Sequence, residues 1–132
     1  MTKGDLLAVA LWKSKRRAKR DVPRNEEGFV RDVTRIALSC SHERLRIDVL
    51  RVLHGVEWPT ASVILHLCHE DPYPILDFRA LWSASAPETT SYTFLFWEAY
   101  TAFCRGVAQG AGVSMRQLDR AMWQYSKEHQ KT

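Results

Sequence analysis

The sequence has few cysteines, no long apolar run and no alternating pattern, and each absence excludes a class of protein. Its three cysteines, Cys40, Cys68 and Cys104, are an odd number without regular spacing, which argues for reduced thiols in the cytoplasm. Leu6 to Trp12 is apolar but is followed by cations and not by a cleavage site, so no signal peptide is expected. No uninterrupted apolar segment approaches the roughly 18 residues of a membrane span. No alternating segment lies between turns, so no sheet is expected either.

Signatures of common cofactors and catalytic groups are missing as well. The chain has no Gly-rich nucleotide-binding loop, and Ser62 lacks the Gly-x-Ser-x-Gly context of a hydrolase nucleophile. His66 and His69 share a helical face, but together with Cys68 or His54 they match no closed zinc pattern. No four-Cys iron–sulfur pattern occurs. We therefore predict a protein without a cofactor and without a metal site.

Positive charge is concentrated at the N-terminus of the 132-residue chain. Residues 1–25 contain eight lysines and arginines against two aspartates, a net charge of +6, whereas the whole chain has +4. Such asymmetry indicates a polyanionic partner, and we expect the basic segment at 13–24 to contact nucleic-acid phosphate. The alternative is a solvated, frayed segment that only aids solubility. The side chains expected at the phosphates are Lys13, Lys15, Arg16 and Arg17.

Apolar residues recur at helical spacing, which predicts an all-α protein of about seven helices in a single domain, residues 1–132. Asn25 is expected to cap the second helix, and Ser114 begins a capping-box pattern before the last. Arg46 is expected on the wetter side of its helix, and Trp97 in the core. The predicted helices span about 4–18, 26–37, 45–53, 60–67, 78–82, 91–107 and 114–127.

The most informative segment is a pair of helices joined by a short turn. Gly55 suits a positive φ just past a helix end, and Pro59 fits the first position of the next helix. Such a hairpin aims backbone N–H groups and a helix N-terminus at one point, where they bind a phosphate. A Gly turn between helices is common by itself. Asp77 adds information, because it lies 22 residues after Gly55 behind a Pro-containing connection.

Six residues of this region match one family pattern: Leu53, Gly55, Val56, Thr60, Ala61 and Asp77. They resemble the helix-hairpin-helix DNA glycosylase superfamily, of the endonuclease III and adenine-glycosylase type. In that superfamily a hairpin of the form Leu-x-Gly-Val-Gly-x-x-Thr-Ala precedes the catalytic Asp by about this distance. The resemblance covers residues 43–83 most closely and implies a central helix-hairpin-helix there.

The resemblance implies a DNA repair protein that holds DNA by its backbone without base preference. Asp77 would stabilise the oxocarbenium-like charge and activate water in a monofunctional base-excision glycosylase. The implied DNA-binding residues are Gly55, Val56, Trp58, Thr60 and Arg79. The implied base pocket, in which aromatic rings stack on an extruded base, is lined by Tyr73, Phe78 and Trp82.

Three departures from the family pattern limit the chemistry. Glu57 replaces the second hairpin glycine and puts a carboxylate beside the presumed phosphate site. Pro59 replaces the Schiff-base lysine of bifunctional members, so an enzyme of this kind would lack lyase activity. The chain of 132 residues also leaves little for a second helical lobe. Asp77 is then a catalytic residue, a retained but inactive position, or a simple helix N-cap.

The leading prediction is a DNA-binding, glycosylase-like protein. The alternative, from a different class, is a non-catalytic DNA-binding or protein-interaction module. In the interaction case, the aromatic helix at 91–107 and the helix at 114–127 would form the face of a homodimer or of another partner. Retention on DNA resin and its loss with salt, against concentration-dependent self-association, separates the two hypotheses.

Overall fold

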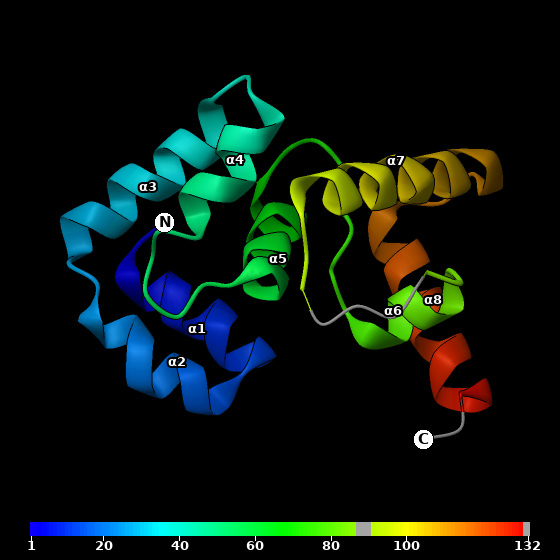
Figure 1. Cartoon of the computed structure of the whole chain (residues 1–132), viewed down its shortest axis with the longest axis horizontal. Helices are drawn as coiled ribbons and strands as arrows, with labels where there is room; N and C mark the ends of the chain where they lie inside the picture. The colour runs from blue at the N-terminus through cyan, green and yellow to red at the C-terminus, as the bar shows by residue number, and fades with distance from the viewer. Residues whose placement is uncertain (87–90, 131–132) are drawn as a thin grey trace. The chain divides into compact units, whose positions relative to one another are not determined.

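The computed structural model describes residues 1–86 and 91–130, and every regular element in them is helical (Figure 1). This confirms the predicted all-α class. The described residues contain eight α-helices and one short 3₁₀ helix, η1, where the sequence suggested about seven helices. In chain order the elements are α1 Lys3–Lys13, α2 Lys15–Asp21, η1 Val22–Arg24, α3 Glu27–Ser39, α4 Glu43–Leu50, α5 Trp58–Cys68, α6 Phe78–Ser83, α7 Phe94–Ala111 and α8 Met115–His129.

The chain divides into two compact units, Met1–Cys68 and His69–Thr132. The first contains α1 to α5 with η1, and the second contains α6 to α8. The first unit has thirteen lysines and arginines against eight carboxylates, a net charge of +5. The second has six against seven, a net charge of −1. The positive charge of the protein thus belongs to the first unit, and the organisation of the whole chain as one domain stays a prediction.

α5 is the most buried helix of the first unit. Ala61, Val63, Ile64 and Leu65 are completely buried, and both α1 and α4 pack against this helix. A helix that is apolar all round must be covered all round, so α5 has to be the centre on which its neighbours pack. The hairpin that precedes it is therefore attached to the most firmly packed element of this unit.

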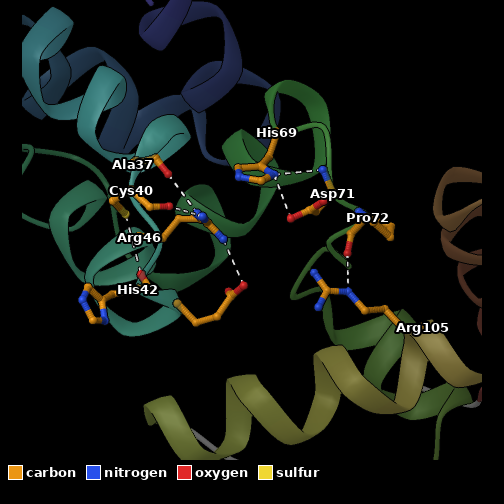
Figure 2. Close-up of polar contacts among 9 residues, drawn as sticks. Ala37, Cys40, His42, Arg46, His69, Asp71, Pro72 and Arg105 are labelled. Atoms are coloured by element: carbon orange, nitrogen blue, oxygen red, sulfur yellow. Dashed lines mark hydrogen bonds and ion pairs between the residues drawn. The ribbon is translucent and has the colours of Figure 1, made fainter.

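Arg46 holds α3 and α4 together at the end of α3 (Figure 2). Its guanidinium donates to the carbonyl of Ala37 at 3.1 Å and to that of Cys40, and it pairs with Glu43 at 2.9 Å. Only 6% of the residue is exposed, so the prediction that it lies on the wetter side of its helix is wrong. The final carbonyls of a helix lack donors within the helix, and the buried guanidinium of Arg46 provides donors at this helix end.

The turn and cap between α7 and α8 follow the sequence closely. Gly112 ends α7 with a left-handed φ of 68°, and Val113 donates back to Ala108 at 3.0 Å. Ser114 and Gln117 form the predicted capping box at the start of α8, with bonds of 3.1 and 2.8 Å. These short-range signals fix where the two long helices of the second unit stop and start.

The core of the second unit is built on aromatic rings. Trp97 of α7 is 1% exposed, as predicted, and stacks on Tyr73 with ring centroids 6.0 Å apart. Arg105 lies over Tyr73 at 4.7 Å and donates to the carbonyl of Pro72 at 2.8 Å, which joins α7 to the extended segment before α6 (Figure 2). α6 packs on α8. Among the described residues, no helix is both long enough and apolar enough to cross a membrane.

Candidate functional site

The turn between α4 and α5 has the backbone that the sequence predicts. Gly55 has a φ of +83°, a conformation that other residues adopt only at a cost. A side-chain carbon at this position would lie 3.0 Å from Cγ2 of Val22 and 3.2 Å from its backbone nitrogen. Glycine is therefore required twice, once for the dihedral angle and once because η1 lies directly against the turn.

Asn25 fastens the same turn to η1. Its side-chain amide donates to the carbonyls of His54 and Val22 at 2.9 and 3.0 Å, while the backbone N–H of His54 donates to its oxygen at 2.9 Å. Asn25 is 3% exposed. The prediction that it caps α3 is wrong, because the N-cap of that helix is Glu26. The side-chain amide of Asn25 instead both donates to and accepts from the backbone of His54, and so connects the hairpin to the basic N-terminal segment.

The predicted hairpin contacts to DNA are restricted by burial. Val56, Trp58 and Thr60 are only 1%, 7% and 5% exposed, so their side chains belong to the protein interior. In the described part of the chain, no hydrogen bond uses the backbone N–H of Gly55 or of Trp58. Pro59 is the second residue of α5, not the first as predicted, and offers no N–H. A phosphate at this hairpin would thus not contact the side chains of Val56, Trp58 or Thr60, and the predicted contact through backbone groups stays a prediction.

The predicted basic segment is helical and presents its cations to solvent. α2 buries only Ala18, and Val22 follows one turn later, each 1% exposed. Ser14, with extended dihedral angles, separates this helix from α1, which the sequence predicted as one element. The exposed cations of α2 are Lys15, Arg16, Arg17, Lys19 and Arg20.

Most of these cations form no ion pair with a carboxylate in the part of the chain that the structure describes. Arg20 pairs with Asp21 at 3.0 Å, and Arg24 approaches the same carboxylate at 3.9 Å. The hydrogen bonds from Arg20 hold the pKa of Asp21 below its usual value, so this carboxylate stays ionised. Within residues 1–86 and 91–130, no ion pair joins the four other α2 cations, two lysines and two arginines, to an aspartate or glutamate. Lys13, the remaining predicted contact, ends α1 and is half-buried.

Asp77 caps α6. Its carboxylate accepts a hydrogen bond from the backbone N–H of Arg79 at 3.4 Å, and its own backbone is extended. The side chain is partly exposed. Burial raises the pKa of Tyr92, and the negative charge of Asp77 adds to that rise. The structure thus contains the helix cap that was one of three alternatives for this residue. Asp77 belongs to the second unit, whereas the hairpin belongs to the first.

The three predicted base-pocket aromatics are not gathered in one pocket. Tyr73 is 1% exposed and packs in the core against Trp97, whereas Phe78 and Trp82 are 58% and 39% exposed on α6. A cavity of about 580 Å³ in the second unit lies between the segment before α6, the end of α7 and the start of α8. None of the three aromatics lines it, and the buried ring of Tyr73 is not open to a stacked base.

Arg79 belongs instead to a surface that sequence analysis missed. Its guanidinium lies 5.1 Å from the ring centroid of Phe78 and 5.5 Å from that of Trp123 on α8. Lys127 lies 5.2 Å from Trp123, one helical turn away. Their spacing of four residues was a readable signal that both project from the same side of a helix. What the sequence did not show is that α6 packs beside them.

No protein-family model, curated protein or solved structure matches this chain. The resemblance to the helix-hairpin-helix glycosylases therefore stays a prediction that rests on the residues themselves. The geometry of α2, the hairpin and the α6–α8 pair has to support a function without help from relatives.

Proposed function

We propose that this protein binds nucleic acid, DNA above all, through the phosphate backbone. The observation that carries the proposal is α2, a helix whose outer surface presents two lysines and two arginines without ion-pair partners in the described chain. Elsewhere in the first unit, exposed arginines have carboxylate neighbours: Arg31 with Glu27, Arg35 with Asp32, and Arg44 with Asp48. Cations without ion-pair partners offer their full charge to phosphates, whereas a neighbouring carboxylate partly neutralises a paired cation.

In this proposal the hairpin positions α2 and is not itself the main contact with DNA. Gly55 and Asn25 fasten η1, which continues directly from α2, to the start of α5. This attachment fixes the direction in which the cations point, which lowers the entropic cost of ordering them on a phosphate backbone. Glu57 disfavours a phosphate directly at the hairpin, because it places a negative charge beside the turn. Contact with the phosphates through α2 carries no base preference.

Catalysis is not included in the proposal. The glycosylase alternative is supported by the spacing from Gly55 to Asp77, but the cap of α6 accounts for the carboxylate. The other function class does have an observation in its favour. On α7, Leu95, Phe103 and Val107 are 76%, 47% and 39% exposed along one helical stripe, which suits a homodimer face. Sedimentation at several protein concentrations separates self-association from DNA binding.

The test compares two triple variants with equal changes in net charge. Lys15→Ala/Arg16→Ala/Arg17→Ala removes unpaired cations of α2, and Arg31→Ala/Arg35→Ala/Arg44→Ala removes paired cations of α3 and α4. Fluorescence anisotropy with a labelled 20-base-pair duplex measures the Kd of each. We expect the α2 variant to bind at least about tenfold more weakly and the control to stay within about threefold. Equal losses in both would show that only net charge matters and would reject the α2 site.

A further inference from the structure

Four large aromatic rings are exposed on neighbouring helices of the second unit. Phe78 and Trp82 of α6 are 58% and 39% exposed, and Trp123 and Tyr125 of α8 are 39% and 51% exposed. Both helices also bury other residues, such as Ala80 of α6 and Met122 of α8, so the packing of the two helices does not rest on these rings alone. Exposed aromatic groups of this extent mark a binding surface more often than chance.

The rings contact cations and one another. Arg79 reaches both Phe78 and Trp123, and Lys127 lies over Trp123 from the next turn. Trp82 and Tyr125 are 5.9 Å apart between ring centroids. No ion pair joins Arg79 or Lys127 to a carboxylate in residues 1–86 and 91–130. Both cations are therefore held in place by aromatic rings and keep their charge available for a phosphate.

We propose that this surface, the stacking face (Phe78, Arg79, Trp82, Trp123, Tyr125 and Lys127), binds unpaired bases of single-stranded nucleic acid. The inference rests on the proposed function and adds a second site with its own ligand. Flat rings offer stacking surfaces to bases of any sequence, and interleaved cations meet the phosphates between them. In a duplex the base faces are covered by their neighbours, so this combination suits a single strand.

The face and α2 have separate ligand chemistries. α2 offers cations without aromatic neighbours among its own residues, which suits any phosphate backbone, single or double. The stacking face offers few cations and four rings, and the second unit as a whole has a net charge of −1. Binding to the stacking face by electrostatic attraction alone is therefore weak, and stacking of the bases on the rings has to provide most of the affinity.

The experiment measures binding of fluorescein-labelled oligo(dT), an abasic strand of equal length, oligo(rU) and a 20-base-pair duplex. The variant Phe78→Ala/Trp123→Ala removes one ring on each side of the contacts that Arg79 makes. The control Phe29→Ala/Ile36→Ala removes two exposed apolar side chains of α3. Circular dichroism verifies that both variants are folded. The α2 triple variant is measured in parallel.

We expect the stacking-face variant to bind oligo(dT) and oligo(rU) about tenfold or more weakly, since a stacked base contributes a factor of this size. Its affinity for the duplex and for the abasic strand should change less than twofold. The control should match the wild type on every ligand.

Two results would overturn the inference and leave the proposed function in place. One is an unchanged oligo(dT) affinity in the stacking-face variant while the α2 variant still loses duplex binding. The other is a dimer that dissociates in the stacking-face variant, which would assign the face to a second copy of the chain. Failure of the proposed function looks different, because either the wild type would not bind the duplex or the α2 variant would bind it no more weakly than the paired-cation control.

Discussion

At the scale of single residues, the hairpin glycine has a role that goes beyond its dihedral angle. Gly55 and Gly112 both have positive φ, +83° and +68°, but a side-chain carbon would meet Val22 at the first and nothing within 4 Å at the second. A substitution by alanine at either position would have the cost of a left-handed backbone conformation. Only at Gly55 would it also have the cost of a steric clash with Val22.

The first prediction concerns this pair. Gly112→Ala should lower the free energy of unfolding by about 1 kcal/mol, the cost of a left-handed conformation. Gly55→Ala should cost at least about 1 kcal/mol more, because the added carbon would lie 3.2 Å from the backbone nitrogen of Val22 and η1 would have to shift. Urea unfolding of both variants measures the difference. Equal losses at the two positions would mean that η1 does not lie against the hairpin.

The second prediction concerns Asp77. As an N-cap, Asp77→Ala should lower the free energy of unfolding by about 0.5–1 kcal/mol, whereas Asp77→Asn should be nearly neutral since Asn caps equally well. Neither change should affect the Kd for duplex DNA. The wild type should release no base from a panel of lesions and mismatches. Base release by the wild type that Asp77→Asn abolishes would establish the glycosylase alternative and contradict the reading as a cap.

Local signals of single residues were predictable from the sequence. The positive φ of Gly55, the capping box of Ser114 and the burial of Trp97 depend on residues within one turn or on strong hydrophobicity, and all three are confirmed. Asn25 was missed because its partner His54 lies 29 residues away. A capping residue and a bridging residue have the same short polar side chain, and only the tertiary contact distinguishes them.

At the scale of elements, the junction of α3 and α4 shows how a buried cation replaces a helix cap. Cys40 follows the last residue of α3 in an extended conformation, and the final carbonyls of a helix lack partners within the helix. Arg46 donates to the carbonyl of Ala37 in the last turn and to that of Cys40 just after it, and pairs with Glu43 of its own helix. The burial of this arginine was unpredictable from periodicity, because it depends on where α3 stops.

The third prediction follows from this junction. Arg46→Met keeps the apolar stem but leaves buried carbonyls without donors, so it should lower the free energy of unfolding by about 2–3 kcal/mol. Arg44→Met is the matched control, since Arg44 is exposed and pairs with Asp48 at 3.3 Å across one turn. It should cost less than about 0.5 kcal/mol. Similar losses in the two variants would show that Arg46 does not hold the helix ends together.

The candidate sites were predictable only in part at this scale. The run of cations between Lys13 and Arg20 is visible in the sequence, but the break at Ser14 and the buried anchor at Ala18 are not. Phe78 and Trp82 were predicted for a base pocket together with Tyr73, which is buried in the core, and Arg79 was predicted as a DNA contact. Phe78, Trp82 and Arg79 acquire neighbours because α6 packs on α8, a long-range contact that no local pattern encodes.

At the scale of the whole molecule, the distribution of charge separates two kinds of surface. The first unit has a net charge of +5 with its unpaired cations on α2, and the second has −1 with exposed rings and two cations on α6 and α8. We therefore expect duplex affinity to depend on salt through the first unit. We expect single-strand affinity to depend on aromatic rings in the second unit.

The most direct test of the central claim is the salt dependence of duplex binding. If the four unpaired cations of α2 displace counterions, a plot of log Kobs against log salt concentration should have a slope of about −3 to −4. Lys15→Ala/Arg16→Ala/Arg17→Ala should make that slope shallower by about 1 for each lost contact. A slope that is the same in this variant as in the wild type would contradict the claim that α2 binds the phosphate backbone.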